Sequence, residues 1–539
     1  MEIRLRYVHV SATVLMALLL AWCWIDGHIV HPVPFYSWKS DPEMGYALNS
    51  LSILRGQPYA YIDHPGTPIE VIGTVLLGLI RLGRGSSSGA FWEQVLEEPE
   101  VFLGVAHGLL TIGSMACLML ISLRAVQVHK WTDVLVALAA AGAFYAVFPS
   151  VSPGTLSLWS HNSFNFPAGT MLLLFLLIRL RSERHLEAWE SWLFGVATGL
   201  LTAVQLYFAT WTIGAMVALG GYRLAQERSW LRSLVTGAQV VMGSLVGFFI
   251  ATEPIIHKYR DLWLWIRSLV VHQGNYGSGP GGIVSKEQIL TNLGTLWSQW
   301  PLPLASTGIA LVLLLGSVIL YGRSGTRSKG WGPLALGLSV QILATFALIV
   351  KHPGGTYLMG LVAAIPVTMA LSLPVYARFG NTFPGILAAV ILVMFLNSIR
   401  LGVQSNRQLA AWMLQSEAEV EQHLDRAASR AGKDAASLTI LWGYGAPSRC
   451  YALRFGDSYT GGVFRDKIDE LCPNDWIFDI WREKAYLPSG PVSLSESSEW
   501  DILVIPADHI PGESAALGNM ETSTDGRWAF IEAPSRGNR

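Results

Sequence analysis

The first 400 residues alternate between long apolar segments and shorter polar connections. Eleven of the apolar segments approach the ~20 residues that a helix needs to cross the hydrocarbon core of a membrane. The run 189–222 is too long for one crossing and short for two, so we divide it near Gln205. The predicted spans are 7–25, 101–123, 131–149, 166–180, 189–205, 208–222, 233–252, 301–321, 332–350, 356–377 and 380–400. This pattern predicts an α-helical polytopic membrane protein.

The first long polar connection, residues 26–100, is expected to contain further helices. Glu43–Arg55 has the pattern of a helix that ends at Gly56. The segment Pro68–Leu82 is apolar but fits no crossing, because counting it would invert every later assignment, and we predict a juxtamembrane or re-entrant helix there. The acidic, amphipathic segment Phe91–Glu100 is typical of an interfacial helix.

The composition changes after Arg400. Gln404–Arg430 has the pattern of an amphipathic helix. Three strand-like runs follow, Leu438–Trp442, Trp500–Pro506 and Trp528–Glu532. We therefore expect two domains, a transmembrane domain of residues 1–403 and a small α/β domain of residues 404–539.

The composition supports the membrane assignment. The 539 residues are 51% hydrophobic and only 14% charged, whereas soluble proteins carry about 25% charged residues. The formal net charge of −1 argues against nucleic acid as a partner. We expect a multi-pass protein of the cytoplasmic (inner) membrane that is surrounded by membrane lipids.

Basic residues predict the orientation of the chain in the membrane. They gather before the first span and after every second span, and basic connections are normally cytoplasmic. The N-terminus is then cytoplasmic, and after eleven crossings the C-terminal domain is extracytoplasmic. The residues are Arg4, Arg6, Arg124, Lys130, Arg179, Arg181, Arg184, Arg223, Arg228, Arg232, Arg323, Arg327, Lys329 and Arg378.

Two of the four cysteines, Cys450 and Cys472, lie in the predicted C-terminal domain. If that domain is extracytoplasmic, these two cysteines can pair, and we predict that they form a disulfide. Two free thiols are the alternative.

The predicted outer connections carry most of the polar clusters. Asp41 and Glu43 open the predicted helix of the first loop, where a carboxylate can serve as a general base or can simply cap the helix. Asp63 and His64 follow, and they suit a divalent metal, a phosphate-facing pair or only a polar turn before Pro65.

The later outer connections add histidines, glycines and cations. His161 and Asn162 form a polar loop, and His272 opens a glycine-rich stretch through Tyr276 in which backbone amides can approach an anion. Lys351 and His352 end a span, where a lysine either binds phosphate or only extends to the interface. Lys258 and Arg260 are further cations.

The acidic pair, Tyr46, Gly56, Tyr59 and Asp63-His64-Pro65 together resemble the first outer loop of GT-C glycosyltransferases. The pattern is most similar to bacterial relatives of the protein O-mannosyltransferases and of the lipid A aminoarabinose transferase. Lys351 through Tyr357 and Leu358 resembles a later element of these families, in which a basic residue precedes a Tyr-Leu run. The chain departs from the pattern in two places, because Pro42 follows Asp41 and because His64 stands where aminoarabinose transferases tend to have lysine.

The resemblance implies transfer of a sugar from a polyprenyl-phosphate carrier to a lipid, glycan or protein acceptor on the outer face, with inversion. Asp41 is then the general base, and Glu43 binds the acceptor or orients the base. Asp63, with His64, His272 or His161, holds a divalent metal (Mg, Mn or Zn) or the phosphate. Lys351, His352, Lys258 and Arg260 are the candidate phosphate-binding residues. The candidate substrate-binding residues are Tyr46, Tyr59, Tyr61, Asn162, Tyr276 and Tyr357.

Three other functions stay open. A lipid-linked oligosaccharide polymerase or ligase has many spans and basic outer loops, but typically no early acidic helix. A transporter or flippase is expected to carry charges within its spans and paired halves, and neither is visible in this sequence. A sensor or assembly subunit would act through its C-terminal domain.

Overall fold

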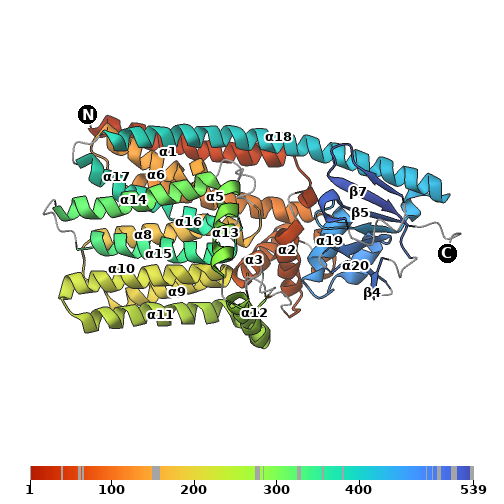
Figure 1. Cartoon of the computed structure of the whole chain (residues 1–539), viewed down its shortest axis with the longest axis horizontal. Helices are drawn as coiled ribbons and strands as arrows, with labels where there is room; N and C mark the ends of the chain where they lie inside the picture. The colour runs from red at the N-terminus through yellow and green to blue at the C-terminus, as the bar shows by residue number, and fades with distance from the viewer. Residues whose placement is uncertain are drawn as a thin grey trace. The chain divides into compact units, whose positions relative to one another are not determined.

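The computed structural model describes residues 2–37, 40–58, 62, 66–85, 87–147, 158–272, 280–282, 285–323, 329–354, 357–378, 382–480, 482–488, 490–494, 499–510 and 519–533. Helices dominate the first four fifths of the chain (Figure 1). The α-helices are α1 (Glu2–Ile25), α2 (Ser40–Leu54), α3 (Thr67–Arg84), α4 (Ser88–Glu97), α5 (Pro99–Ala125), α6 (Trp131–Val147), α7 (His161–Phe164), α8 (Thr170–Arg181), α9 (Ala188–Val204), α10 (Ala209–Glu227), α11 (Trp230–Thr252), α12 (Tyr259–Val271), α13 (Lys286–Gln299), α14 (Pro301–Arg323), α15 (Trp331–Lys351), α16 (Leu358–Val362), α17 (Ile365–Arg378), α18 (Phe383–Ala431), α19 (Arg449–Ser458) and α20 (Arg465–Leu471). The strands are β1 (Ile440–Trp442), β2 (Asp475–Asp479), β3 (Lys484–Leu487), β4 (Gly490–Ser493), β5 (Ile502–Pro506), β6 (Met520–Thr522) and β7 (Trp528–Glu532).

The chain is a helical polytopic membrane protein with a C-terminal mixed β-sheet. Within the described residues, eight helical segments are long and apolar enough to cross a membrane. The three remaining predicted spans coincide with α6, α9 and α10, which are shorter or less apolar. The cytoplasmic or outer location of each end is not fixed by this structure, so the predicted orientation stays a prediction.

The predicted break in the apolar run 189–222 is confirmed. Helix α9 ends at Val204, and Gln205 adopts an extended conformation with φ −156° and ψ 128°. A short 3-10 turn, Leu206–Phe208, then leads into α10. The run therefore forms two helices, as the alternation of basic connections requires.

Glycines allow α9 and α11 to pack with their backbones in close contact. A Cβ at Gly199 would lie 2.0 Å from the carbonyl oxygen of Ser244, and one at Gly247 would lie 2.2 Å from that of Val196. Gly195 and Gly243 approach the opposite backbone in the same way. Small residues four positions apart are the usual means by which membrane helices approach closely.

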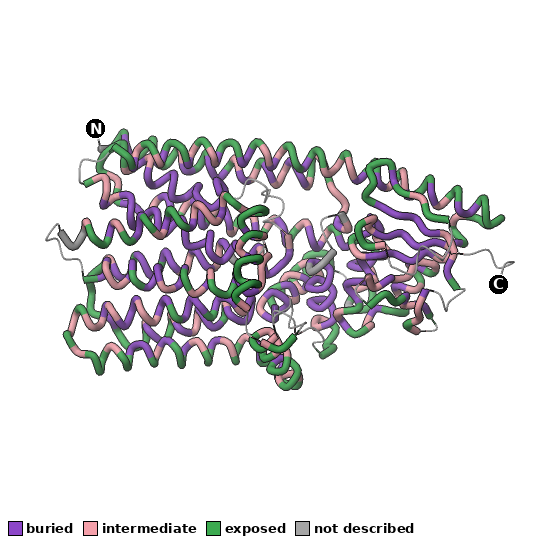
Figure 2. The backbone as a smooth tube through the Cα atoms, in the orientation of Figure 1, coloured by how far each residue is buried: buried purple, intermediate pink, exposed green. Residues whose placement is uncertain are grey.

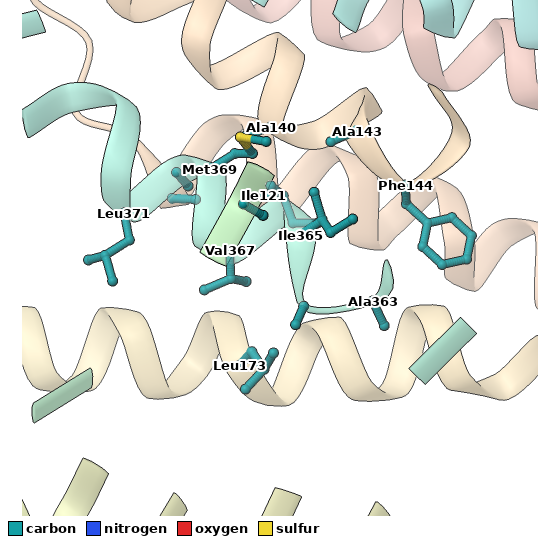
Figure 3. Packing of buried hydrophobic residues seen from close by; sticks show 14 of the residues in the cluster. Ile121, Ala140, Ala143, Phe144, Leu173, Ala363, Ile365, Val367, Met369 and Leu371 are labelled. Atoms are coloured by element: carbon teal, nitrogen blue, oxygen red, sulfur yellow. The ribbon is translucent and has the colours of Figure 1, made fainter. Parts of the chain in front are cut away.

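Helices α16 and α17 together form the apolar segment Leu358–Arg378, which lies at the centre of the apolar core of the membrane helices and is almost entirely buried. Figure 3 shows Ile365, Val367 and Met369 of this segment among side chains of α5, α6 and α8. By contrast, large hydrophobic residues of α11 such as Leu234 and Ile250 are exposed (Figure 2). Large hydrophobic residues that are exposed along a helix are expected where lipid, rather than water, surrounds it.

The last predicted span and the predicted amphipathic helix after it form one continuous helix. Helix α18 runs for 49 residues from Phe383 to Ala431 without an interruption near Gln404. The change from apolar to amphipathic composition at this point does not end the helix, and no proline lies between Gly385 and Ala431.

The C-terminal part forms a seven-stranded sheet with the order β4-β3-β2-β1-β5-β7-β6. The central strand β1 pairs in parallel with both β2 and β5, and all other pairs are antiparallel. Strand β7 has the bounds that the sequence predicts, and β1 and β5 begin two residues later than predicted. Apolar clusters cover both faces of the sheet, one around Tyr451 and Phe455 of α19 and one around Trp500.

The contacts divide the chain into two compact units. The first comprises Met1–Ile25, Ile62–Ile69 and Gly108–Gln404, and the second comprises Asp26–Tyr61, Glu70–His107 and Ser405–Arg539. The second unit therefore combines most of the predicted first outer loop with the β-sheet. The domain boundaries 1–403 and 404–539 stay a prediction.

Candidate functional site

Helix α2 carries the predicted catalytic acids in the second unit. Asp41 lies in its first turn, but the side chain of Asp41 is outside the described part of the structure. The Glu43 side chain is buried, and its Oε1 lies 2.5 Å from Nε2 of His107 in α5. His107 in turn contacts His28, with 2.8 Å between its Nδ1 and the His28 Nε2. Glu43, His107 and His28 thus form a hydrogen-bonded chain that leads from a buried carboxylate to a partly buried imidazole.

A second buried acid lies close in sequence to His28. Asp26 is fully buried, and its Oδ1 lies 3.4 Å from Nη2 of Arg407 and 3.9 Å from Nε2 of His31. Burying a carboxylate is costly unless it is paired and hydrogen-bonded. In the second unit, basic side chains from distant parts of the sequence lie beside both Glu43 and Asp26 and offset this cost.

Helix α2 packs against α19 of the C-terminal sheet domain. A Cβ at Gly456 of α19 would lie 3.0 Å from the Met44 backbone, and Gly45 of α2 faces the Tyr459 ring. At the other end of α2, the Arg55 guanidinium lies 4.3 Å from the centre of the Trp92 ring of α4. The acidic helix is therefore held by the C-terminal domain and not by the first loop alone.

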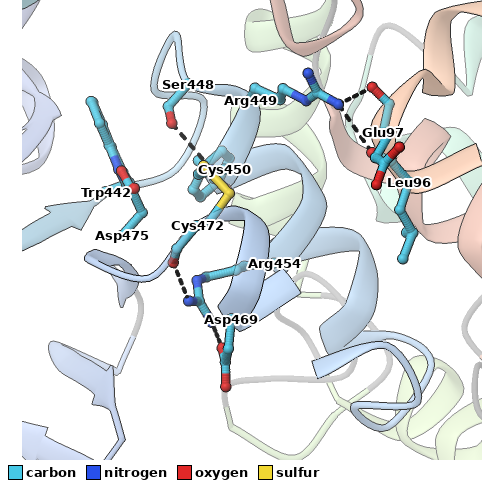
Figure 4. Close-up of a disulfide and its surroundings, with 11 residues drawn as sticks. Leu96, Glu97, Trp442, Ser448, Arg449, Cys450, Arg454, Asp469, Cys472 and Asp475 are labelled. Carbon is cyan, nitrogen blue, oxygen red and sulfur yellow. Dashed lines mark hydrogen bonds and ion pairs between the residues drawn. A yellow bond between two sulfur atoms is a disulfide. The ribbon is translucent and has the colours of Figure 1, made fainter. Parts of the chain in front are cut away.

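The predicted disulfide between Cys450 and Cys472 is confirmed, and it joins α19 to the residue that follows α20 (Figure 4). Next to it, Arg449 donates hydrogen bonds to the carbonyl oxygens of Leu96 and Glu97 in α4. The disulfide thus lies in the segment that connects the sheet domain with the helices of the first loop.

In the first unit, Lys351 and His352 lie where α12, α13 and α15 meet. The Lys351 side chain is buried, and its Nζ donates a hydrogen bond to the Val270 carbonyl oxygen of α12. The neighbouring Val350 carbonyl accepts a hydrogen bond of 2.8 Å from Asn292 of α13. Lys351 forms no ion pair with a carboxylate among the residues that the structure describes.

Burial lowers the pKa of His352 below its usual value, and the adjacent Lys351 charge lowers it further, against a hydrogen bond with the Leu269 backbone. His352 is therefore neutral near pH 7 unless an anion binds beside it. The pair contributes one buried positive charge and one imidazole whose protonation a bound anion would favour.

The glycine-rich stretch begins at the same place. His272 and Gly281 form an antiparallel bridge, and the Gly282 amide donates a hydrogen bond of 2.7 Å to the Val271 carbonyl. These contacts close the base of the stretch beside Val270, the residue that Lys351 contacts. The structure thus brings the backbone of His272 close to Lys351 and His352, while the glycine-rich residues 273–279, including Tyr276, lie outside its described part.

Other predicted residues of the first unit lie elsewhere in that unit. His161 is buried at the start of α7, and Asn162 accepts a hydrogen bond of 3.4 Å from Gln205. Lys258 ends a 3-10 helix and Arg260 is exposed in the first turn of α12. Tyr357 is half-buried directly before α16.

Of the remaining predicted residues, the structure places only Tyr46. Tyr46 in the second unit is fully buried. Tyr59, Tyr61, Asp63 and His64 lie outside the described residues, so their assigned roles stay predictions. Among the described residues, no group of three or more His, Cys, Asp or Glu side chains is arranged to hold a metal ion. The divalent metal stays a prediction that depends on Asp63 and His64.

The sequence reasoning missed His28 and His107. His107 lies within the predicted span 101–123, where an ionisable residue in an apolar helix is itself a signal of function. That signal identifies His107 as a candidate, but it does not identify Glu43 as its partner, because 64 residues separate the two in the chain.

These features define a multi-pass membrane protein with a buried acidic helix, a buried cation and an extended C-terminal sheet domain. No protein-family model and no curated protein matches the chain in sequence. The chain is similar to the crystal structure of ArnT from Cupriavidus metallidurans bound to undecaprenyl phosphate, with a TM-score of 0.48 and 12% identity over 97% of this chain and 98% of that chain.

Proposed function

We propose that this chain is a glycosyltransferase of the GT-C type that moves a sugar from a polyprenyl-phosphate donor to an acceptor on the outer face of the membrane, with inversion. The observation that carries the proposal is the buried Lys351. Among the residues that the structure describes, no carboxylate pairs with this ammonium group. A buried charge in such surroundings is costly, and an anionic ligand would offset that cost. Lys351, His352 and the base of the glycine-rich stretch supply a cation, an imidazole and backbone close to one another.

The donor phosphate is assigned to Lys351 and His352, and the acceptor hydroxyl to the acids of α2. In the proposed step, the acceptor oxygen forms a bond to the anomeric carbon while Asp41 accepts its proton. The bond between the anomeric carbon and the phosphate oxygen breaks, and its electron pair leaves with the phosphate. Positive charge near the phosphate stabilises the negative charge that develops there. Glu43 is assigned the role of orienting the acceptor or the base, with His107 holding its carboxylate.

The disulfide supports the location on the outer face. Disulfides form and persist in oxidising compartments and are rare in the cytosol. Cys450 and Cys472 belong to the domain that the basic connections place outside. A domain beside the acidic helix in that compartment fits a lipid-linked donor whose sugar is presented at the outer surface.

The experiment that tests the proposal uses the purified full-length protein in phospholipid nanodiscs with radiolabelled polyprenyl-phosphate sugars and envelope extract as acceptor. Transfer of label to an acceptor, dependent on Asp41, is the expected result. Movement of intact donor between leaflets of proteoliposomes without cleavage would instead identify a flippase. Joining of lipid-linked oligosaccharides to one another would identify a polymerase or ligase.

A further inference from the structure

A cavity of about 780 Å³ lies in the C-terminal sheet domain, within the second unit. Three neighbouring strands form its floor. Ile477 of β2 pairs with Tyr486 of β3, Tyr486 pairs with Pro491 of β4, and all three residues line the cavity. Helices α19 and α20 form its wall. Ligand pockets typically measure about 300–1,000 Å³, so the cavity is large enough for a ligand of several rings. The reaction proposed above does not use it.

Aromatic rings line this cavity, and neighbouring groups hold them in place. The Tyr486 hydroxyl accepts a hydrogen bond of 3.0 Å from Arg482, and Tyr444 packs edge-to-face on Phe455 with 6.0 Å between ring centres. One face of Trp476 is covered by the Arg454 guanidinium at 4.0 Å. Because Arg454 covers one face of Trp476, the flat apolar surfaces at the cavity are the rings of Tyr444 and Tyr486. A tyrosine ring combines an apolar face with a polar hydroxyl at its edge.

The charged groups of the cavity are balanced. Its lining contains three arginines and three aspartates, Arg454, Arg465, Arg482, Asp457, Asp469 and Asp479. Arg454 contacts Asp469 at 2.7 Å, and Arg482 lies 3.8 Å from Asp479. Burial raises the pKa of Asp457, although its carboxylate accepts hydrogen bonds from Thr460 and the Phe464 amide. A lining without excess charge disfavours a polyanion or a lone cation.

We infer that this cavity binds an oligosaccharide of uncharged sugars. The rings supply faces for the apolar side of a pyranose, and the planar arginine and aspartate groups supply directional donors and acceptors for hydroxyls. An apolar chain would leave the remaining hydrogen-bonding capacity of these paired groups unused. A phosphate would meet as many carboxylates as guanidinium groups.

Helix α19 connects this cavity to the acidic helix. Its residues Arg454, Asp457 and Ser458 line the cavity, while its Gly456 packs against Met44 of α2. A glycan bound along α19 therefore lies on the helix that supports Asp41 and Glu43. That this glycan is the acceptor of the transfer rests on the proposed function, whereas the binding itself does not.

Saturation-transfer NMR on the full-length protein in phospholipid nanodiscs tests the binding, since glycoside detergents would compete for the cavity. The probes are neutral trisaccharides of glucose, mannose, galactose, rhamnose and N-acetylglucosamine. Tyr486→Ala should weaken binding of at least one trisaccharide by about tenfold, while Tyr486→Phe keeps the ring and retains binding. Trp412→Phe is the matched control, because Trp412 contacts Asp525 away from the cavity.

The outcomes separate this inference from the proposed function. Binding that is lost in Tyr486→Ala, with an unchanged melting temperature and an intact disulfide, supports the pocket. If Tyr486→Ala does not fold, Arg482→Met provides the same comparison from the exposed rim. No binding of any trisaccharide by the wild-type protein, or equal binding by all variants, overturns the inference. Glycan binding without sugar transfer would contradict the proposed function and leave the pocket in place.

Discussion

Glu43 and Lys351 are two buried ionisable side chains, one acidic and one basic, and their surroundings differ. Glu43 in the second unit is matched by His107, which is itself hydrogen-bonded to His28. Lys351 in the first unit contacts a backbone carbonyl, and no carboxylate pairs with it in the described part of the chain. Glu43 is thus hydrogen-bonded by a neighbouring side chain within the protein. Lys351 has no carboxylate partner among the described residues, and an anionic ligand beside it would offset the cost of burying its charge.

The largest expected effect concerns the acidic helix. Asp41→Asn should reduce the single-turnover rate of sugar transfer by about 10²–10⁴-fold, because asparagine keeps the shape but cannot accept the acceptor's proton. Donor affinity should remain nearly unchanged, since the phosphate is assigned to Lys351. Rapid-quench measurements of transfer and equilibrium binding of labelled donor provide the two values.

Glu43→Gln is the matched variant for this prediction. Its carboxylate already has a histidine partner, so its loss should slow transfer less than the loss of Asp41. Wild-type turnover by Asp41→Asn would show that Asp41 only caps the helix. A larger defect in Glu43→Gln would move the role of base to Glu43.

This comparison also shows what could be predicted from sequence. The membrane spans depend on local apolar runs of a set length, and the structure has a helix at each of them. Strand β7 is equally local, with a continuous apolar run from Trp528 to Ile531. Strands β2, β3, β4 and β6 were not predicted. Strands β3 and β4 are only 4 residues long, β6 is only 3 residues long, and β4 contains Gly490 and Pro491.

The contacts at the candidate site could not be predicted in the same way. The sequence identifies Glu43 and Lys351 as charged residues in unusual places. Their partners, His107 and the Val270 carbonyl, lie 64 and 81 residues away and are set by tertiary packing. The sequence can indicate that a charged residue lies in an unusual, apolar place. Only the folded structure shows which group contacts it.

The second prediction tests the buried charge of Lys351. Lys351→Met should weaken donor binding by about 10–100-fold, the equivalent of one charged hydrogen bond of about 1.5–3 kcal/mol. The same variant should melt at an equal or higher temperature, because it removes a buried charge that no carboxylate of the described residues pairs with. Equilibrium binding of a labelled polyprenyl-phosphate sugar and thermal unfolding in nanodiscs measure both. A lower melting temperature with unchanged donor affinity would make Lys351 a structural residue.

The third prediction tests Glu43, the buried acid that has a histidine partner. Here the variant should lower the stability of the protein, whereas Lys351→Met should keep or raise it. His107→Leu should destabilise the second unit by about 1–3 kcal/mol, because it leaves the buried Glu43 carboxylate without its imidazole partner. The double variant Glu43→Leu/His107→Leu should recover part of that loss, since it removes both polar groups. Denaturant unfolding monitored on the C-terminal domain gives the free energies. Additive losses in the double variant would show that the two side chains are not coupled.

The smallest expected effect is the pH dependence of donor binding through His352. Burial beside Lys351 depresses the pKa of this imidazole below its usual value, so it is neutral near pH 7 and gains its proton only at lower pH. The donor is a phosphodiester whose charge does not change in this range, and it favours the protonated imidazole. Donor affinity should therefore rise as the pH falls below the usual histidine value of about 6.5, by less than about tenfold per pH unit because one proton is taken up.

In the absence of donor, lowering the pH should instead reduce the stability of the protein. A histidine with a depressed pKa in the folded state makes the fold less stable as it protonates, so the melting temperature of the free protein should fall over the same range. His352→Gln should abolish both dependences while leaving Lys351 in place. Affinity that does not vary with pH in the wild-type protein, or that varies equally in His352→Gln, would place the donor phosphate away from His352.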